Sequence, residues 1–342
     1  MIENGGVRVR EARCCLLCGG EGVQLYSDLR DRLFGAPGIW SLMKCSKCQL
    51  VWLNPQPISD DVGKLYARYF THEELCAHKR ALMGLRETLK ANILKASYGY
   101  QMNGSNRMLE LILSNIGPLV DIAGGGVLYL KACEIGRLLD VGCGNGLFLD
   151  QMRRLGWEVV GVEPDEKAAS VAVEKLELEV FCGSLKDAKF PDGHFDAITM
   201  NHVIEHATDP LELLKECRRI LRPGGKLVVV TPNIESLGRR VFGNAWLHWD
   251  PPRHLFLFSS EILRKLAELA GLVILEMRTT AKGARGVLVE SNLIKRDGTR
   301  KGDLTETPVA SLRLQGLAFQ AIEHGLCRCG KVGEELVMVA TI

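Results

Sequence analysis

The sequence has 342 residues, which at roughly 150 residues per domain suggests about two domains with a sizeable core. Hydrophobic residues make up 46% and charged residues 25%, and 43 basic against 41 acidic residues leave a net charge of +2. This ordinary composition excludes disorder as the main state. Because the near-neutral balance supplies no clustered basic surface, we expect no nucleic acid partner and no anionic membrane partner.

The first residues, MIENGGVRVREARCC, carry charges but no apolar run of signal-peptide length, so we expect a cytoplasmic protein. The most apolar stretch, 112–130, is interrupted by Asn115, Pro118, Asp121 and three consecutive glycines. A membrane span needs about 20 mostly apolar residues, so we interpret this stretch as a buried or linker segment. Twelve cysteines in such a protein indicate reduced thiols or metal ligands rather than disulfides.

Four of the cysteines form two C-x2-C pairs near the N-terminus, Cys15 with Cys18 and Cys45 with Cys48. Two residues between cysteines let one tight turn direct both sulfurs at a single cation, and two such turns complete the tetrahedral shell that Zn²⁺ prefers. We therefore predict a structural zinc site that folds a small leader. An iron–sulfur cluster and two coincidental pairs of buried thiols are the alternatives, and Cys14 could replace Cys15 as a ligand.

Three parts follow one another along the chain. We expect a zinc-binding module over residues 1–70, ending in an amphipathic helix that contains Tyr66 and Tyr69, and then a helical connector over 71–133. From 134 to 342, short apolar runs alternate with helical segments, which is the pattern of a parallel sheet covered by helices.

In this last part the apolar runs predict strands over 138–141, 158–163, 178–181, 195–201, 226–231, 273–277 and 335–342. Helices are predicted over 147–155, from Pro164, from Pro210 after the N-cap Asp209, and between Ser259 or Ser260 and Gly271. The stretch 222–225, RPGG, reads as a turn, and 295–303, KRDGTRKGD, reads as a solvated loop.

A glycine-rich loop joins the first of these strands to its helix. Such a loop lets the backbone approach a ligand, and the helix behind it offers free N–H groups. The acid Glu163 ends the next strand, where a carboxylate can accept hydrogen bonds from both ribose hydroxyls of a nucleoside. The dinucleotide fingerprint G-x-G-x-x-G fails because its third glycine would fall at Leu147. The loop itself consists of Asp140, Gly142, Gly144 and Gly146 with one residue between each.

At these residues the chain resembles the class I S-adenosylmethionine-dependent methyltransferases, through LLDVGCGNG, VVGVEPD, FDAITMNHVIEH and LRPGG in that order. The resemblance implies an α/β, Rossmann-like, seven-stranded mostly parallel sheet with an antiparallel last strand, and S-adenosylmethionine across the carboxyl ends of the first four strands. Ser184 stands where many relatives have an acid near the adenine amino group. The cofactor-binding residues implied are Asp140, Gly142, Gly144, Gly146, Glu163, Ser184, Leu185 and Asn201.

The N-terminal part adds a looser resemblance. CLLCGG followed by KCSKCQLVWLNPQP is similar to bacterial methyltransferases with a zinc-binding leader, a group associated with cell-surface polysaccharides or secondary metabolites. Certain sugar C-methyltransferases also carry an N-terminal zinc module. The resemblance therefore implies a small-molecule acceptor such as a sugar, a nucleotide sugar or a phenolic metabolite.

Methyl transfer from a sulfonium is an in-line displacement, so positioning can supply most of the catalysis, and a base is needed only if the acceptor must lose a proton. The candidate bases are His202, Glu205 and His206 in one stretch and His248, Asp250 and His254 in another. Of these, His202, His254 and His206 are the predicted catalytic residues. Histidine has a pKa near working pH without perturbation. A hydrogen-bonded structural role is the alternative for each. In quinone-biosynthesis relatives a stretch similar to NHVIEH is associated with a divalent metal.

The segment 246–258 follows the fifth predicted strand and combines four aromatic residues with His248, Asp250, Arg253 and His254. Loops beyond the carboxyl ends of sheet strands are where substrates bind. We expect a lid for a ring-bearing or anionic acceptor, with Arg253 as a clamp for phosphate or carboxylate. The alternative is that the aromatic residues only cover the sheet edge.

Two other functions compete with methyl transfer. The first is a cofactor-binding or partner-docking protein that keeps the methyltransferase fold without turnover. The second is a nicotinamide oxidoreductase, which Leu147 and the LRPGG turn disfavour.

Overall fold

The computed structural model describes residues 2–66, 80–102, 105–299, 309–327 and 330–342. Internal contacts divide the chain into two compact units. The first unit contains Met1–Tyr69, His202–Leu214 and Val230–Met338, and the second contains Phe70–Asn201, Lys215–Val229 and Val339–Ile342. The boundaries expected near residues 70 and 133 stay a prediction.

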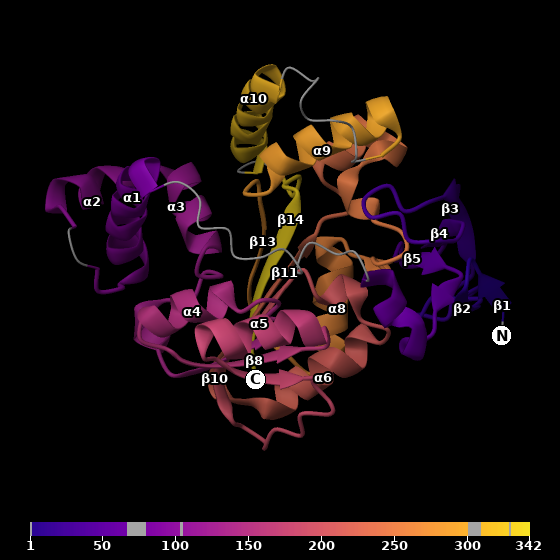
Figure 1. The fold of residues 1–342 in the computed structure, drawn as a ribbon, viewed down its shortest axis with the longest axis horizontal. Helices are drawn as coiled ribbons and strands as arrows, with labels where there is room; N and C mark the ends of the chain where they lie inside the picture. The colour runs from indigo at the N-terminus through magenta and orange to yellow at the C-terminus, as the bar shows by residue number, and fades with distance from the viewer. Residues whose placement is uncertain (1, 67–79, 103–104, 300–308, 328–329) are drawn as a thin grey trace. The chain divides into compact units, whose positions relative to one another are not determined.

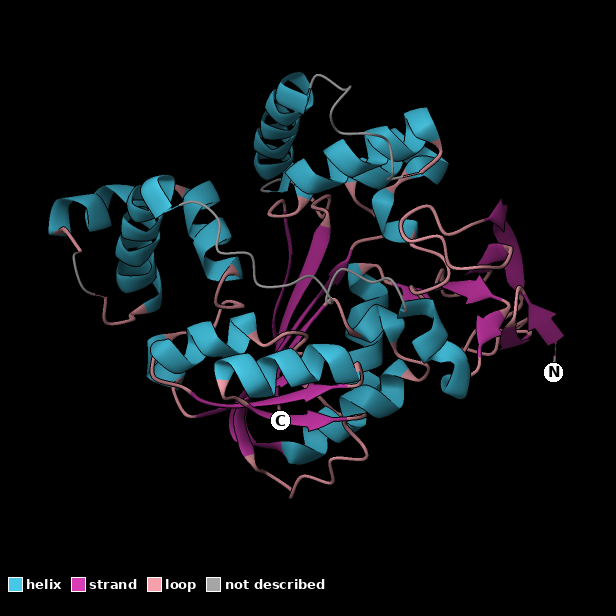
Figure 2. Ribbon diagram, viewed as in Figure 1, coloured by secondary structure: helices cyan, strands magenta, loops and turns pink. Residues whose placement is uncertain are grey.

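A seven-stranded sheet has the order β13-β14-β11-β10-β7-β8-β9 (Figures 1 and 2). It is mostly parallel with one antiparallel strand, which confirms the predicted Rossmann-like α/β class. The strands β7, β8, β9 and β10 pair in parallel, so their carboxyl ends reach the same edge of the sheet. The strands are β7 (Arg137–Val141), β8 (Glu158–Glu163), β9 (Glu179–Cys182), β10 (Phe195–Asn201), β11 (Leu221–Pro232), β13 (Val273–Thr280) and β14 (Glu335–Thr341).

Helices follow the strands in the alternation that the sequence predicts. The N-cap Asp165 accepts hydrogen bonds from the backbone N–H groups of Lys167 and Ala168, so the second helix begins at Glu166 and not at Pro164. Ser259 caps α8 in the same way. The helices are α4 (Leu147–Arg154), α5 (Glu166–Leu176), α6 (Pro210–Ile220), α7 (Leu237–Phe242), α8 (Ser260–Leu269), α9 (Ala284–Asp297) and α10 (Val309–Cys327).

Two further predictions in this part were wrong. Strand β11 begins at Leu221 and includes the expected turn, because its backbone has a partner there: Thr341 Oγ1 donates to the Gly225 carbonyl. Lys295–Asp297 belong to α9 rather than to a solvated loop, because α9 buries an apolar face that includes Leu293 and Ile294. The rest of that segment is Gly298 and Thr299, described as loop, and 300–303, which lie outside the described residues.

The leader is built on two small sheets and lies in the first unit. One sheet has the order β1-β2-β6 and the other β12-β5-β4-β3, so the two-residue strand β12, which follows β11 in sequence, pairs with the leader. Trp40 and Trp52 are buried, and Trp52 Nε1 donates to the Ala12 carbonyl at 2.7 Å. The strands are β1 (Ile2–Asn4), β2 (Val7–Arg10), β3 (Gly22–Leu29), β4 (Trp40–Cys45), β5 (Val51–Asn54), β6 (Gln56–Pro57) and β12 (Phe256–Leu257).

The leader ends differently from the prediction. The residues Ser59–Tyr66 form a 3-10 helix, η1, in place of an amphipathic α-helix, and Tyr69 lies outside the described residues. Further single turns of 3-10 helix are η3 (Ala132–Glu134), η4 (Ile204–His206), η5 (Gly243–Ala245) and η6 (Leu247–Trp249).

The described part of the connector is helical, as the sequence predicts, with α1 (Arg80–Tyr98), α2 (Arg107–Leu113) and α3 (Gly117–Gly125). The Asn106 side chain caps α2 by accepting from the Met108 and Leu109 N–H groups. Within the described residues, none of the helices alone has the length and apolar content for a membrane span. The bent pair α2 and α3, which turns by 100°, meets both criteria jointly.

Candidate functional site

The glycine loop lies between β7 and α4 in the second unit. Gly142, Gly144 and Gly146 have φ angles of 72°, 55° and 80°, a region that side chains rarely adopt. A Cβ on Gly146 would lie 2.6 Å from Leu178 Cδ1 and 2.8 Å from Ala172 Cβ. The loop therefore needs glycine at Gly146 both for its backbone angle and for its close approach to α5.

Two acids frame this loop. Asp140 is the second-last residue of β7, is almost fully buried and accepts a hydrogen bond from Thr199 Oγ1 at 2.7 Å. Burial, with the charge of Glu163 nearby, raises the pKa of Asp140 to about 7. Glu163 accepts from the Gly144 N–H at 2.8 Å through Oε2 and from the Asp165 N–H at 2.9 Å through Oε1. Burial raises the pKa of Glu163, and the two N–H bonds oppose that rise.

The other expected cofactor residues lie in the same unit. Ser184 follows β9 and is exposed, and its hydroxyl donates to Asp187 Oδ2 at 2.5 Å. Leu185 is buried, and Asn201 is exposed at the end of β10. An acidic residue, Asp187, therefore lies beside Ser184, three residues later in the sequence. The roles of Ser184, Leu185 and Asn201 stay predictions.

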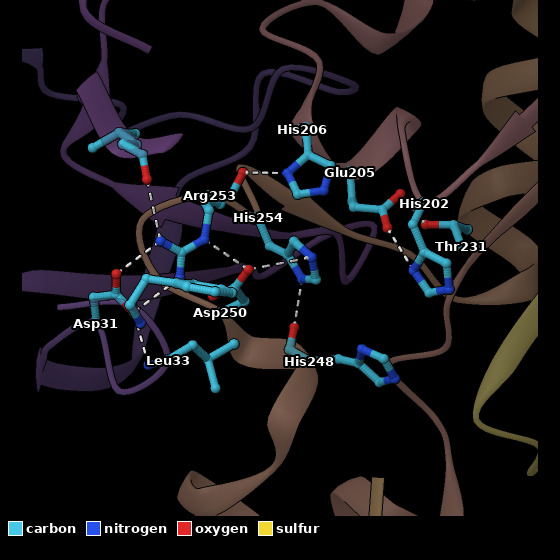
Figure 3. A network of polar contacts seen from close by, with 12 residues as sticks. Asp31, Leu33, His202, Glu205, His206, Thr231, His248, Asp250, Arg253 and His254 are labelled. Carbon is cyan, nitrogen blue, oxygen red and sulfur yellow. Dashed lines mark hydrogen bonds and ion pairs between the residues drawn. The ribbon is translucent and has the colours of Figure 1, made fainter. Parts of the chain in front are cut away.

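A second cluster, of histidines and carboxylates, lies in the first unit (Figure 3). His202 follows β10, with its Nδ1 3.1 Å from Glu205 Oε1 and its Nε2 3.1 Å from Glu335 Oε1. Burial opposes a charge on this ring, but the bonds to both carboxylates outweigh burial and raise the pKa of His202 to about 10. Contrary to the expected unperturbed pKa, His202 is protonated at neutral pH, so it cannot accept a further proton.

The neighbouring histidines bond to backbone carbonyls rather than to carboxylates. His206 Nδ1 lies 3.0 Å from the Arg253 carbonyl oxygen, and His254 Nδ1 lies 2.7 Å from the His248 carbonyl oxygen. Because a carbonyl can only accept, each Nδ1 carries a hydrogen, and Nε2 is the ring nitrogen left for a proton or a cation. Burial, with the nearby His254, lowers the pKa of His206 to about 4, and burial lowers that of His248 to about 3.

Three of these side chains bring donor atoms together. One ligand atom each from Glu205, His206 and His254 lies within 4.8 Å of the other two. Glu205 is fully buried, accepts from Thr231 Oγ1 at 2.8 Å and has its pKa lowered to about 2, chiefly because its bond to His202 overcomes burial. Metal-binding histidines usually donate their other ring N–H to a carbonyl or carboxylate, as both rings do here. The cluster could therefore hold a divalent cation.

Arg253 does not have the role that the sequence analysis expected. Its side chain is fully buried, and the guanidinium binds Asp31 of the leader at 2.7 and 2.8 Å and Asp250 at 3.0 Å (Figure 3). It also lies over the Phe34 ring, 4.7 Å from the centroid. With its donors committed to two carboxylates, Arg253 cannot clamp a substrate anion, and it fastens the leader to the segment after β11.

The aromatic residues of the same segment are buried rather than open to a ligand. Trp246, Trp249, Phe256 and Phe258 are each at most 3% exposed. The Trp246 ring packs edge-on against Trp249, with centroids 5.2 Å apart. The expected aromatic and basic lid was therefore wrong, because these rings form part of the core that the leader shares with the segment.

The four predicted cysteine ligands converge in the leader. The sulfurs of Cys15, Cys18, Cys45 and Cys48 lie within 4.8 Å of one another, as a single tetrahedral cation requires. Cys14 is exposed and lies outside the cluster, so the fourth sulfur comes from Cys15 and not from Cys14. Burial opposes a negative charge on Cys45, but N–H bonds from Cys48 and Lys47 lower its pKa to about 6. The described site has four sulfur donors and no fifth group in the cluster.

Comparison with known proteins places residues 75–277 in a family described as methyltransferase domain. The ubiquinone biosynthesis O-methyltransferase of Caulobacter sp. (strain K31) is 38% identical over 125 residues, which cover 34% of this chain and 50% of that protein. The enzyme of the same name from Xanthomonas oryzae pv. oryzae is 37% identical over 103 residues, which cover 28% and 43%.

This chain thus spans about half the length of the curated relatives it matches. Among solved structures, phosphoethanolamine N-methyltransferase 2 of Haemonchus contortus, in complex with S-adenosyl-L-methionine, aligns over 89% of this chain and 63% of its own, with 16% identity and a TM-score of 0.46. The matched family segment covers more than half of the chain and includes the glycine loop and Glu163. The resemblance to class I S-adenosylmethionine-dependent methyltransferases is confirmed, and the chain belongs to the methyltransferase domain family.

Proposed function

We propose that this chain transfers a methyl group from S-adenosylmethionine to a small-molecule acceptor. The observation that carries the proposal is the 2.8 Å hydrogen bond from the Gly144 N–H to Glu163 Oε2. This bond holds Glu163, the acid expected to bind the ribose of the cofactor, against the glycine loop. An ionised carboxylate has about four lone-pair sites. Glu163 can therefore accept two ribose hydroxyls while it keeps its bonds to Gly144 and Asp165.

When bound, S-adenosylmethionine would supply a methyl group already activated by its sulfonium. The work left to the protein is then to hold donor and acceptor in line and to exclude water. Asp140 would lie beside the methionine end, and Ser184, Leu185 and Asn201 would complete the site as the family resemblance implies. Relatives named for O-methylation in ubiquinone biosynthesis favour an oxygen acceptor, which a sugar, a nucleotide sugar or a phenolic metabolite would provide.

The proposed roles of the three histidines follow from their protonation. His202, held as a cation between Glu205 and Glu335, would act by its charge rather than as a base. His206 and His254 each bond to a backbone carbonyl through Nδ1, so Nε2 of either ring could take a proton from an acceptor hydroxyl. We place His254 first, because His206 Nδ1 is also 3.0 Å from the Tyr66 hydroxyl and is held more firmly.

A metal-assisted version of the same reaction is the second candidate. The convergence of Glu205, His206 and His254 favours it, and two imidazole donors suit zinc or iron better than magnesium. Such an ion would lower the pKa of a bound hydroxyl. Metal analysis separates the metal-assisted reaction from one in which His254 acts as a base. His254→Gln should contain one metal ion per chain fewer than wild type if an ion binds at this cluster, and the same number if His254 is a base.

We propose zinc as the cation of the four-cysteine cluster, with a structural role. A closed site of four sulfurs leaves no open coordination position for chemistry. Its removal by a chelator should unfold the leader, because metal binding and folding are coupled in such small modules. Elemental analysis that finds iron, or no metal, in the purified protein would refute this assignment.

Calorimetric titration with S-adenosylmethionine tests the cofactor site. Glu163→Ala should weaken binding by about 1 to 3 kcal/mol, from the loss of charge-assisted hydrogen bonds. Glu158→Ala, at the exposed start of the same strand, is the matched control and should bind normally. NAD should give no comparable heat. Unchanged affinity in Glu163→Ala would contradict the proposed site.

Turnover is tested separately, by measuring S-adenosylhomocysteine release with panels of sugars, nucleotide sugars and phenols. Cofactor binding with release above the background for one acceptor class supports the enzyme. Tight cofactor binding without release from any class would favour the rival, a cofactor-binding or partner-docking protein.

A further inference from the structure

Helix α10 (Val309–Cys327) presents an apolar stripe to solvent. Counting from Leu314, the residues three, four, seven, eight, eleven and twelve positions later are all apolar or glycine, and all are exposed. This is the spacing of one helix face. The large side chains are far more open than core residues: Leu314 is 68% exposed and Ile322 59%. The stripe consists of Leu314, Leu317, Ala318, Ala321, Ile322, Gly325 and Leu326.

The opposite face of α10 contacts the rest of the first unit, so the helix is already packed in the fold without its apolar stripe. The Gln320 side chain donates to the carbonyls of Ala281 and Lys282, at 3.0 and 2.9 Å. The buried Glu323 accepts from the Glu334 N–H at 2.5 Å. Within the described residues, α10 is therefore held on one side, and its apolar side is exposed.

We propose that this stripe is the contact through which two copies of the chain associate, with the two α10 helices antiparallel. The middle of the stripe matches itself under a two-fold rotation. Small residues, Ala318 and Ala321, lie at its centre and allow close approach, and the bulky Leu317 and Ile322 flank them. With the crossing point at the centre, Leu317 of one copy comes level with Ile322 of the other.

Charge also favours the antiparallel second copy. Arg313 is exposed at the N-terminal end of the stripe and is the cation that borders it among the described residues of α10. Antiparallel pairing brings Arg313 next to the C-terminal carbonyls of the other α10, near Cys327, where the helix dipole favours a positive charge. Parallel pairing would instead place the two arginines side by side.

A membrane surface suits the stripe less well. A helix that lies on a bilayer carries a polar face rich in lysine and arginine, whereas the second face of α10 is packed inside the protein. One helix pair is at the low end of protein interface sizes. We therefore expect reversible association in the micromolar range.

Sedimentation velocity of the full chain, over a concentration series that spans this range, tests the proposal. Wild type should shift from monomer to dimer as concentration rises. Leu317→Glu alone and Ile322→Lys alone should each remain monomeric, because a charge is then buried in the contact. A mixture of these two variants should recover the dimer, because Leu317 meets Ile322 only in the antiparallel arrangement. Val173→Glu, which places the same charge at an exposed aliphatic position of α5, is the control and should dimerise like wild type.

Unchanged S-adenosylmethionine binding and circular dichroism in each variant establish that the fold is intact. The proposal is overturned if wild type stays monomeric throughout, if the single variants dimerise like wild type, or if the mixture stays monomeric. It is also overturned if monomeric wild type sediments with phosphatidylcholine–phosphatidylglycerol vesicles and Leu317→Glu does not, since the stripe would then be a membrane-binding surface.

Discussion

The buried ion pair between Asp31 and Arg253 offers the sharpest test of how the leader is held. Asp31→Asn removes the charge but keeps the shape of the side chain. Both partners have fully buried side chains, so the substitution leaves Arg253 with Asp250 as its remaining carboxylate. Breaking a buried pair by removing one partner costs about 3 to 5 kcal/mol, because the remaining charge is buried without full compensation.

The local backbone adds to this cost. Besides Arg253, the Asp31 carboxylate accepts from the N–H groups of Leu33, Phe34 and Ala36, at 2.8, 3.0 and 2.7 Å. An asparagine has one acceptor oxygen, so it cannot satisfy all of these donors, and its amide nitrogen must face one of them. We therefore expect the upper part of that range for Asp31→Asn.

Urea unfolding followed by tryptophan fluorescence is a suitable assay. Trp40, Trp52, Trp246 and Trp249 all lie in the unit that contains the ion pair, so the signal reports mainly on that unit. The matched control is Glu11→Gln, which breaks the exposed pair with Arg13 and should cost at most about 1 kcal/mol. Cofactor binding serves as a check on the second unit and should change little.

A double-mutant cycle separates the pair from its surroundings. Asp31→Asn and Arg253→Met together should cost less than the two single costs added, by about 1 to 3 kcal/mol, because the second substitution removes the stranded charge. The reasoning is refuted if Asp31→Asn costs no more than Glu11→Gln, or if the two substitutions add within error.

Three further predictions concern other parts of the chain. Gly146→Ala should destabilise the protein and weaken S-adenosylmethionine binding more than Gly224→Ala does. Both glycines have φ near 80°, but only a Cβ at Gly146 would contact neighbouring atoms. Equal losses of binding in calorimetry would show that the contacts with Leu178 and Ala172 do not matter. Cys15→Ser should lose zinc from the leader while Cys14→Ser keeps it, as measured by elemental analysis, and the reverse result would move the ligand to Cys14. Burial, with the charge of Glu334, raises the pKa of Glu323 to about 9. The folded protein therefore favours the protonated Glu323 carboxyl, whose contribution to the free energy of unfolding is fully present below the unfolded pKa of about 4.3 and is lost as pH rises through 9. Wild type should therefore lose stability to urea between about pH 5 and about pH 9, and Glu323→Gln should lose less; identical pH profiles would exclude Glu323 as the cause.

Apolar runs were enough to predict where the strands lie, and the family resemblance implied the seven-stranded sheet that they form. The strand over 195–201 and the start of α6 at Pro210 agree with the structure residue by residue, since buried parallel strands are short continuous apolar runs and proline after an N-cap begins a helix. Helices α9 and α10 were missed. Both depend on contacts with residues distant in sequence, which local patterns do not reveal. Ser291 of α9 accepts from the Leu247 N–H, and Gln320 of α10 donates to the Ala281 carbonyl.

The cysteine ligands were predictable because a metal imposes its own spacing on the chain. The state of the histidines was not. His202 takes its second carboxylate from Glu335, 133 residues away, and nothing in the local sequence indicates that pair. Arg253 was misread for the same reason: its partner Asp31 is 222 residues distant, so an arginine beside histidines resembled a substrate clamp.

The position of β14 in the sheet has a consequence for biosynthesis. Although β14 is the last strand in the sequence, it lies between β13 and β11 rather than at an edge. While the chain is still emerging from the ribosome, the earlier strands can pair, but β11 and β13 have no common neighbour, and His202 lacks Glu335. The histidine network is therefore completed only once β14, which begins at Glu335, has been translated and inserted into the sheet. A nascent chain stalled before that point should bind molecular chaperones through the exposed flank of β11.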